Sequence, residues 1–585
     1  MEGEATFTSN YRFNMVLKSV SVNDAERARN SVCMDSLKTW ILSEGGKVQK
    51  VKTCTTSPRR FVAAEQINGS DSNGQPIFSI PISCLMHPAL AKSDPKYGST
   101  LTKLANEHGV DDRTILTLFL ALEKGRGDTS RWATYIRTLP ETISIPLNWT
   151  QDELMELAGT RLEKAVMEHQ EALKKQAEKW APLLLSYLRQ QQRDLTSSQL
   201  NEEIHEEDFL WAETALAPDR IAWARSCVWS RAFSLYIRRK KTVALVPLGD
   251  MLDHSPHSQV EWRTDDAAGM FSIVSYDNVP IGSEIYNNYG AKSNAELLLG
   301  YGFVLEKNEA DTLNIQLATN DLTDHGNNDH LSDREYRDDL MKYCGVNKSF
   351  SLRADDPMPD SLLLAASVVL MSPSDAYRLP SEISGDFSPQ EILNHDMVRF
   401  DLCTAFRVAR TLQQLFSDEL ERLQMGRPLA SNSQERVRPF IARMSAVHRE
   451  SQIKIARAAL VRLSAYAKQL VTELSRAERE RLASCAGTQT STPVENNDHM
   501  QSYQRWEDSL GIDREIVQEL QVRRNHDVLG CGVGGLRLLS RAFEGDELGA
   551  VPIHSFITAG KDIMEISKAV GTNRQEAALE ATLLD

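Results

Sequence analysis

The stretch from residue 243 to residue 304 constrains this chain more than any other part of its sequence. A β-prone run, Val243 to Leu248, leads into a short turn that contains Asp250, Asp253, His254 and Ser255. The stretch closes on tyrosines set among glycines: Tyr286, Tyr289 and Tyr301. Acidic groups and an imidazole can hold a polar ligand, and phenol hydroxyls in an apolar pocket can orient a proton or a small electrophile. The pattern therefore predicts a binding or catalytic site.

The same stretch, and the rest of the chain, lack the spacings of common metal and phosphate sites. There is no CxxC pair, no HExxH helix and no GxxxxGK loop. The predicted site is therefore one that works without a metal.

Several short motifs in this stretch resemble the SET-domain protein methyltransferases, in the branch typified by the Rubisco large-subunit lysine methyltransferase. The matching residues are, in order, Asp250, Asp253-His254-Ser255, Tyr289-Gly290, Ser293-Asn294-Ala295-Glu296-Leu297 and Tyr301-Gly302-Phe303. Their number and order make the resemblance specific, whereas Asp-His-Ser alone would carry no information. The resemblance implies an α+β chain: a SET fold of short β-sheets with a pseudoknot, split by a helical insertion and followed by an all-helical C-terminal substrate-binding domain.

The resemblance also assigns roles to particular side chains. It implies S-adenosyl-L-methionine as the cofactor and places Ser230, Arg231, Asp250, Asp253 and His254 in its binding site. A guanidinium such as that of Arg231 suits the carboxylate of this methyl donor, although an isolated arginine is more often a surface ion pair. Tyr301 is the predicted catalytic hydroxyl of the target channel. Tyr289 is predicted to shape the channel, or simply to pack in the core.

Two departures from the family pattern stand out. Residues 56 to 60, Thr-Ser-Pro-Arg-Arg, occupy the place of a Gly-rich turn. Proline there removes one backbone N–H, and no glycine relaxes φ. Asp253 stands where the family has Asn, which exchanges an amide for a group that only accepts hydrogen bonds when ionised. Because Arg231 is available to hold the carboxylate of the methyl donor, we expect Asp253 to face its ammonium.

The rest of the chain divides by pattern. Residues 1–32 are predicted to be poorly ordered, and a helix is expected from about Met34, with Leu37, Trp40 and Ile41 on one face and Gly45 at its end. The SET domain is assigned to 33–320, with the insertion at about 95–225, where Trp132 and Tyr135 are expected to be core aromatics. A helical substrate-binding domain at 330–484 and a linker at 485–500 follow. Residues 501–585 weakly repeat the opening of the SET fold, with glycines at Gly530, Gly532, Gly534 and Gly535, which indicates a truncated duplication or a fusion.

Composition sets outer limits on these interpretations. The chain has 585 residues, 41% of them hydrophobic and 25% charged, which suits two or three globular domains. The net charge of -15 argues against non-specific nucleic-acid binding. It is consistent with a basic substrate, although acidity that only maintains solubility is the simpler reading. We expect no metal, no nucleic acid partner and a monomer.

Cysteine usage and hydropathy address the compartment. The eight cysteines show no pairing pattern, and the N-terminal sequence lacks a basic-then-apolar signal. The longest apolar run, Leu362 to Met371, is far shorter than the roughly 20 residues of a membrane helix. The sequence therefore predicts a reducing, cytoplasmic location, with the nucleus as a second possibility, and no membrane contact.

Three functions remain open at this point. The leading one is a protein-lysine N-methyltransferase that acts on a non-histone substrate, such as a ribosomal protein or a translation factor. A protein-histidine methyltransferase on the same fold is the second, although the intact Tyr301-Gly302-Phe303 favours lysine. The third is a catalytically decayed binding module, which the two departures from the family pattern would explain.

Overall fold

The computed structural model describes residues 24–54, 61–69, 73–197, 210–317, 330–383, 388–393, 402–426 and 437–486. These residues form two compact units. The first unit comprises the residues up to Leu157, then Leu162–Ala310 and Pro428–His448. The second comprises Ala158–Arg161, Asp311–Arg427 and the residues from Arg449 onward. The predicted linker after Ala486, the 501–585 repeat and residues 56–60 lie outside the described residues.

The first unit opens with helix α1, Asp24–Ser43. Met34, Leu37 and Ile41 are buried at helical spacing, which confirms the predicted apolar face. The helix starts ahead of the expected position near Met34, so the expectation of a poorly ordered N-terminus is corrected for residues 24–32. The reason is that this segment has few large apolar residues to mark a helical face, yet its alanines, arginines and Glu26 have high helix propensity.

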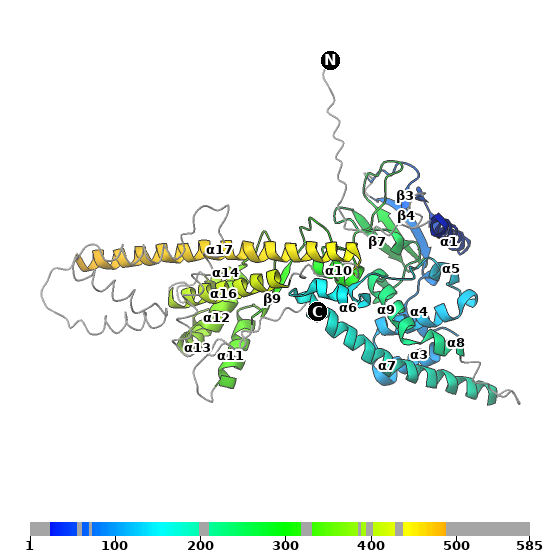
Figure 1. The fold of residues 1–585 in the computed structure, drawn as a ribbon, viewed down its shortest axis with the longest axis horizontal. Coiled ribbons are helices and arrows are strands. Elements are labelled where there is room, and N and C mark those ends of the chain that lie inside the picture. Colours follow the sequence, from blue (N-terminus) through cyan, green and yellow to red (C-terminus); the bar gives the residue numbers. More distant parts are fainter. Residues whose placement is uncertain are drawn as a thin grey trace, which may run out of the picture. The chain divides into compact units, whose positions relative to one another are not determined.

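The first unit contains a four-stranded antiparallel sheet in the order β1-β4-β8-β7, of which Figure 1 labels β4 and β7. Its strands are Lys47–Val48, Gln75–Pro81, Met270–Ser275 and Val260–Asp265. Ile77, Phe78 and Ile80 of β4 are fully buried, and the β4–β8 register shifts at Pro76. Two hairpins complete the β structure: β2–β3 (Val51–Thr53, Phe61–Ala63) and β5–β6 (Phe233–Ile237, Lys240–Ala244).

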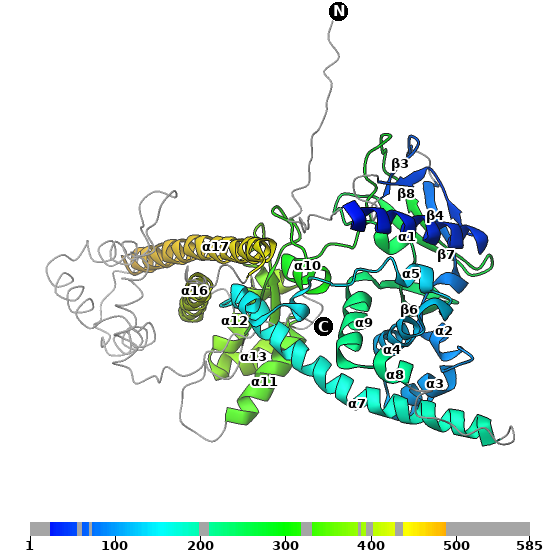
Figure 2. The ribbon, with the colours of Figure 1, turned by 45° about the vertical axis from the view of Figure 1, so that its right-hand side comes forward.

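Between β4 and β5 the chain is helical, as the insertion predicts. The helices are α2 Pro88–Lys92, α3 Gly98–His108, α4 Asp112–Gly125, α5 Ala133–Ile136, α6 Gln151–Leu154, α7 Arg161–Ser197, α8 Leu210–Ala215 and α9 Pro218–Arg231. Helix α4 is apolar on nearly every face and packs against α8 and α9 (Figure 2). This packing fixes the end of α9, from which Arg231 projects.

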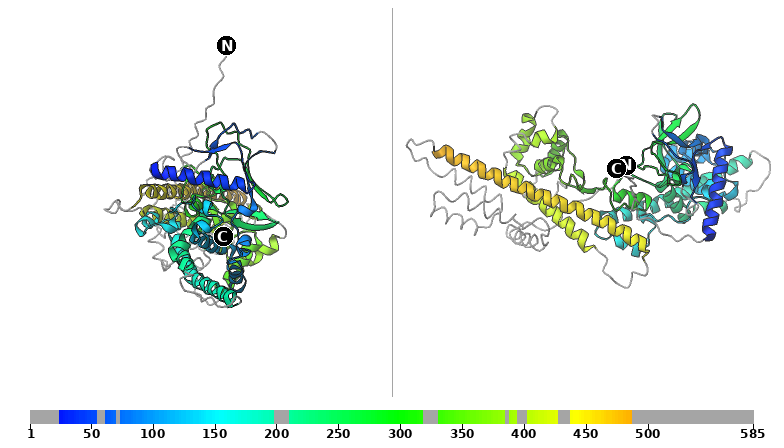
Figure 3. Two further views of the ribbon diagram at one scale, coloured as in Figure 1. Left: turned by 90° about the vertical axis from the view of Figure 1, so that its right-hand side faces the viewer. Right: turned by 90° about the horizontal axis from the view of Figure 1, so that it is seen from above.

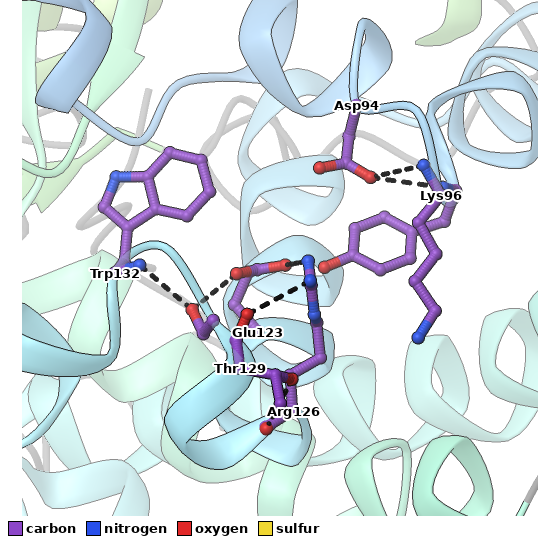
Figure 4. Close-up of polar contacts among 8 residues, drawn as sticks. Asp94, Lys96, Glu123, Arg126, Thr129 and Trp132 are labelled. Atoms are coloured by element: carbon purple, nitrogen blue, oxygen red, sulfur yellow. Dashed lines mark hydrogen bonds and ion pairs between the residues drawn. The ribbon is translucent and has the colours of Figure 1, made fainter.

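One charged residue lies inside this helical layer. The Glu123 carboxylate is fully buried and accepts hydrogen bonds from Arg126 Nη1 (3.1 Å) and Ser130 Oγ (2.5 Å). Ser130 Oγ in turn accepts from the backbone N–H of Trp132 at 3.0 Å (Figure 4). Burial raises the pKa of Glu123, against the opposing effect of these partners. The network ties the end of α4 to the segment that leads into α5 and Tyr135.

The second unit is mainly helical. Its helices are α11 His330–Tyr343, α12 Asp360–Leu370, α13 Pro373–Glu382, α14 Pro389–Leu393, α16 Leu402–Met425 and most of the long α17, Pro439–Ala486 (Figure 3). Leu364, Phe416 and Ala456 lie in its core. Unlike the helical pattern expected here, the unit also holds a two-stranded sheet, β9 Leu313–Gln316 with β10 Ser349–Leu352.

Two further observations concern membrane-spanning helices and disulfide bonds. No helix among the described residues is long and apolar enough to cross a membrane. Among the described residues, Cys33, Cys54, Cys84, Cys227 and Cys344 form no disulfide bond.

Helix α10, Asn294–Tyr301, presents the first residue of the Tyr-Gly-Phe motif, and Gly302 ends it. Gly302 has a left-handed backbone (φ 76°), and a Cβ at this position would lie 2.5 Å from the Ser144 carbonyl oxygen. Only glycine fits here, because any other residue would be strained at this positive φ and its Cβ would clash with the Ser144 carbonyl oxygen. The glycine therefore allows the end of α10 to pack against the insertion.

We predict that Gly302→Ala destabilises the protein more than Gly269→Ala. Gly269 also has positive φ (65°), but a Cβ there would meet nothing within 4 Å. The control variant should cost about 1 kcal/mol of backbone strain, and Gly302→Ala about 2 kcal/mol more from the clash. Thermal melting of both variants against the wild type measures the difference. Equal melting temperatures would show that the Ser144 backbone can move away from the added Cβ without lowering the stability of the protein.

Candidate functional site

The turn after β6 adopts a strained backbone. Leu248 is buried with φ 68° and ψ -45°, a combination that a branched side chain rarely adopts. It is followed by a single 3-10 turn, Gly249–Met251, held by a 3.0 Å hydrogen bond from Asp250 N to Val246 O. Strain of this kind costs on the order of 1–3 kcal/mol and is common where a side chain must be aimed. Here the strained turn directs Asp250 into the interior of the unit.

Asp250 is held by a tyrosine and an arginine from distant segments. The Tyr135 hydroxyl donates to Asp250 Oδ2 at 2.6 Å. Arg231 Nη1 donates to the Asp250 backbone oxygen at 2.9 Å and lies 3.8 Å from Oδ2. The other carboxylate oxygen, Oδ1, is buried and has no hydrogen-bond partner among the described residues. A buried acceptor of this kind favours a ligand that supplies a donor.

Burial dominates the electrostatics of this cluster. It raises the pKa of Asp250 to about 6, although Arg231 and the Tyr135 hydrogen bond oppose the shift. Burial also raises the pKa of Tyr135 well above its usual value, and the adjacent Asp250 carboxylate adds to this effect. Tyr135 therefore remains a hydrogen-bond donor throughout the neutral range.

Residues 253–255 pair with residue 287, which follows them at a distance in the sequence. Asn287 N donates to Asp253 O and Ser255 N donates to Asn287 O, both at 2.8 Å. Ile285 N donates to Phe61 O at 3.0 Å, so this later segment is bonded to β3 as well as to the turn. Such a crossing of separate segments is what the pseudoknot of the expected fold requires.

His254 supports its neighbours rather than offering a base. Its side chain is buried, and Nδ1 accepts a 3.0 Å hydrogen bond from Tyr289 N. Burial lowers the pKa of His254 to about 4. A neutral imidazole whose Nδ1 is already engaged orders the Tyr289 backbone.

Three aromatic rings stack in succession beside the turn. The His254 and Tyr289 ring centroids are 5.0 Å apart at 22°, and those of Tyr289 and Tyr301 are 4.9 Å apart at 27°. The Tyr289 hydroxyl donates to Leu252 O at 2.8 Å, whereas the Tyr301 hydroxyl has no hydrogen bond to the described residues. Burial raises the pKa of both phenols. Both are therefore neutral near pH 7, and that of Tyr301 is free to contact a ligand.

The Ser-Asn-Ala-Glu-Leu motif explains how Tyr301 is placed. Ser293 and Glu296 form a reciprocal capping box at the start of α10. The buried Asn294 side chain donates to Leu305 O and accepts from Leu305 N, each at 3.0 Å. Cap and amide therefore fix both the start of the helix and the chain that follows it, and Tyr301 lies between these two points.

These elements enclose a small cavity in the first unit. It is lined by Ser230, Arg231, Ala232, Phe233, Asp250, Trp262, Asn287, Tyr289 and Tyr301. The Trp262 indole packs on Phe233 (ring centroids 4.5 Å apart) and donates to Asn287 Oδ1 at 2.9 Å. Asn287 Nδ2 is buried without a partner among the described residues. Within the described residues, no three His, Cys, Asp or Glu side chains gather as they would around a metal ion.

The cavity brings together most of the site residues that the sequence predicts. Tyr301, Tyr289, Ser230, Arg231 and Asp250 line it, whereas Asp253 and His254 lie in the adjoining turn. The Ser230 hydroxyl donates to Ser226 O at 2.7 Å, within its own helix. Asp253 is partly exposed, and its charge contributes to the raised pKa of Tyr289.

Sequence reasoning missed several residues of this site. Tyr135 was expected to be only a core aromatic, but its hydroxyl is the hydrogen-bond donor to Asp250. Phe233, Trp262 and Asn287 line the cavity without having been predicted. Asn287 lies two residues before Tyr289, so the motif offered a signal for it. Phe233 likewise lies two residues after Arg231. No local pattern identifies Tyr135 and Trp262, because they come from α5 and β7, which only folding brings to the site.

Comparison with known proteins gives relatives for part of the chain. No protein-family model matches it. It is 30% identical over 242 residues to the ribosomal lysine N-methyltransferase set10 of Schizosaccharomyces pombe, which covers 40% of this chain and 39% of the relative. It is 29% identical over 368 residues to the Rubisco large subunit N-methyltransferase of Pisum sativum, covering 58% and 64%. An actin-histidine N-methyltransferase of Xenopus tropicalis matches at 26% over 284 residues, covering 47% and 44%.

These matches span between 39% and 64% of the relatives' own length. Among solved structures, the SET domain of LSMT bound to lysine and AdoHcy superimposes with a TM-score of 0.55 at 18% identity, covering 81% of this chain and 98% of that one. Rubisco LSMT bound to AdoMet gives a TM-score of 0.53 at 19% identity, covering 80% and 99%. The similarity of fold thus extends well beyond the segments with recognisable sequence identity.

We predict that Tyr135→Phe destabilises the protein, whereas Tyr97→Phe does not. Both phenols are fully buried, but the Tyr97 hydroxyl has no partner among the described residues. Removing the donor to Asp250 should cost about 1–3 kcal/mol, because it leaves a buried carboxylate oxygen unsatisfied. Urea unfolding of the two variants measures this difference. If Tyr97→Phe were as unstable as Tyr135→Phe, the loss of stability would come from altered packing and not from the hydrogen bond to Asp250.

The same comparison has a definite pH dependence. Because burial raises the pKa of Asp250 to about 6, its ionisation as the pH rises through this value lowers the stability of the folded protein. The hydroxyl of Tyr135 opposes that cost by stabilising the charged form. The deficit of Tyr135→Phe relative to the wild type should therefore be larger above pH 6 than below it.

Proposed function

Because the chain has the SET fold, in the form seen in the Rubisco large-subunit methyltransferase, we propose that it is an S-adenosyl-L-methionine-dependent protein-lysine N-methyltransferase of a non-histone protein. The observation that carries this proposal is the cavity in which a buried carboxylate, a guanidinium and an unengaged phenol meet. The arrangement suits a cationic donor beside a target amine and requires no metal.

The polar groups of the cavity fit the methyl donor. Its amino-acid end carries an ammonium and a carboxylate, and its sulfonium supplies the methyl group. Arg231 uses Nη1 for Asp250, and its other N–H groups form no hydrogen bond within the described residues, which leaves them available to a carboxylate. The unpaired Oδ1 of Asp250 and Nδ2 of Asn287 offer an acceptor and a donor in the same cavity. Asp253 would face the donor's ammonium from the adjoining turn.

Methyl transfer to an amine needs alignment and a neutral nucleophile more than a strong base. Desolvation in an aromatic cavity lowers the pKa of a lysine that enters it. The Tyr301 hydroxyl, which is neutral and without an internal partner, would orient the amine lone pair toward the methyl carbon. The hydroxyl of Tyr289 is held by Leu252 O and would fix the channel wall against which Tyr301 stacks.

We expect Tyr301→Phe to lower kcat by at least about tenfold with little change in donor affinity, because it removes an orienting hydroxyl and almost no volume. Tyr289→Phe is the matched control, since it removes a hydroxyl that the protein itself engages. Methyl incorporation from labelled donor and calorimetric donor binding supply the two readouts. Unchanged turnover in Tyr301→Phe, with loss in Tyr289→Phe, would transfer the catalytic role to Tyr289.

Asp253→Asn tests the position that departs from the family pattern. We expect the wild type to bind the donor near neutral pH and to lose affinity as the pH falls through the range where this carboxyl protonates, because the ammonium then loses its partner. The Asn variant should bind without that pH dependence. Much tighter binding by the Asn variant at neutral pH would instead identify Asp253 as a lesion and favour a decayed binding module.

Mass spectrometry of the modified residue decides the class of enzyme. Methyllysine in a cellular protein, formed by the wild type and not by Tyr301→Phe, is the expected product. Methylhistidine would favour the second function that the sequence left open, which the Xenopus relative represents. We propose a ribosomal, translation-factor or other non-histone protein as the substrate, a monomeric enzyme, and a cytoplasmic location that extends to the nucleus.

A further inference from the structure

The tip of the β5–β6 hairpin carries four consecutive cations, Arg238, Arg239, Lys240 and Lys241 (β6 is labelled in Figure 2). All four are exposed, and none is in an ion pair within the part of the chain that the structure describes. The nearest acidic contact is to the backbone: Asp266 Oδ1 accepts from Arg238 N at 2.8 Å. Four adjacent cations without a side-chain ion pair contrast with the net charge of -15 of the whole chain.

The backbone of the tip is unfavourable for its residues. Arg238 and Arg239 form a two-residue turn between the paired Ile237 and Lys240, with φ values of 48° and 62°. A turn with positive φ at both positions favours Asn-Gly, because side chains with a Cβ are strained there. Strain of this kind, combined with repulsion between like charges, is found where a function requires those side chains.

The hairpin begins at the wall of the proposed active site. Ala232 and Phe233 line the cavity, and β5 runs from Phe233 to Ile237 immediately before the tip. At about 3.3 Å per residue, the tip lies roughly 16 Å along the strand from the cavity wall. Tyr236, 60% exposed and paired with Lys241, lies on the way. An extended peptide with its lysine in the cavity would reach the tip with residues about four to six positions away.

We propose that the β5–β6 tip docks an acidic segment of the substrate protein, so that the enzyme selects lysines with acidic residues about four to six positions away. The inference rests on the proposed methyltransferase function. Protein is favoured over nucleic acid because the basic cluster is confined to one turn, whereas 81 acidic residues oppose 66 basic ones over the chain. The tip would supply selectivity and faster association rather than tight binding.

The test uses the full chain and labelled peptides with one central lysine. Paired glutamates are moved outward from the lysine on either side, with glutamine versions as neutral probes. Lys240→Glu combined with Lys241→Glu reverses two of the four charges and so neutralises the tip, because Arg238 and Arg239 remain. Lys47→Glu combined with Lys52→Glu makes the same charge change at exposed lysines of β1 and β2, and serves as the control. Fluorescence anisotropy measures binding, and methyl incorporation is measured in parallel.

We expect the glutamate peptides to bind about tenfold more weakly to the tip variant than to the wild type or the control at low salt, and the difference to shrink as salt increases. Arg238→Asn combined with Arg239→Gly gives an independent variant that relieves the strained turn. It should melt at a higher temperature than the wild type and still bind acidic peptides less well. A higher melting temperature together with weaker peptide binding would show that the binding loss comes from the missing charges and not from a failure to fold.

Other outcomes overturn the proposal. Equal binding of glutamate and glutamine peptides would remove the acidic preference. A labelled single-stranded RNA that binds more tightly than the peptides, and is lost in the tip variant, would assign the tip to nucleic acid. Charge-dependent binding without transfer on any peptide or cellular protein would refute the methyltransferase but leave the docking site. Methyl transfer that depends neither on the charges flanking the lysine nor on the tip variants would support the methyltransferase and refute the docking site.

Discussion

The proposed site depends on how the buried carboxylate of Asp250 is held by its neighbours. Removing a carboxylate from water costs several kcal/mol unless hydrogen bonds and an opposite charge replace the lost solvation. Here Tyr135 supplies the hydrogen bond and Arg231 the charge, yet one oxygen stays unpaired. Incomplete compensation explains why burial still raises the pKa of Asp250 to about 6. A bound ligand that donates a hydrogen bond to Oδ1 would supply the missing partner.

The partners of Asp250 show why the helical insertion matters to chemistry. Tyr135 belongs to α5 within the insertion, and Arg231 ends α9, which leads back to the β structure. The buried network of Glu123, Arg126 and Ser130 fixes the chain just before α5. The insertion is thus part of the frame that holds the carboxylate, and its packing acts on the cavity through Tyr135.

Strain is placed at two turns of the same β region. Leu248 aims Asp250 inward, and the Arg238-Arg239 turn displays cations outward. Positive φ is unfavourable for leucine and for arginine, so in both turns the surrounding structure determines the backbone conformation. The first turn is held by the buried core around β6, and the second by the β5–β6 register and the Asp266 hydrogen bond.

The sequence by itself determined the motifs and much of their local geometry. The Ser293 and Glu296 capping box, the glycine that ends α10 and the buried face of α1 follow from short-range rules of hydrogen bonding and periodicity. The ordered motifs also indicated the SET fold, and the comparison of structures bears this out. Only the tertiary structure decided that Tyr135 bonds to Asp250, that residues 253–255 pair with Asn287, and that Trp262 and Phe233 close the cavity. These contacts join segments far apart in the chain, and their side chains carry no local pattern, because their burial and partners are set by long-range packing.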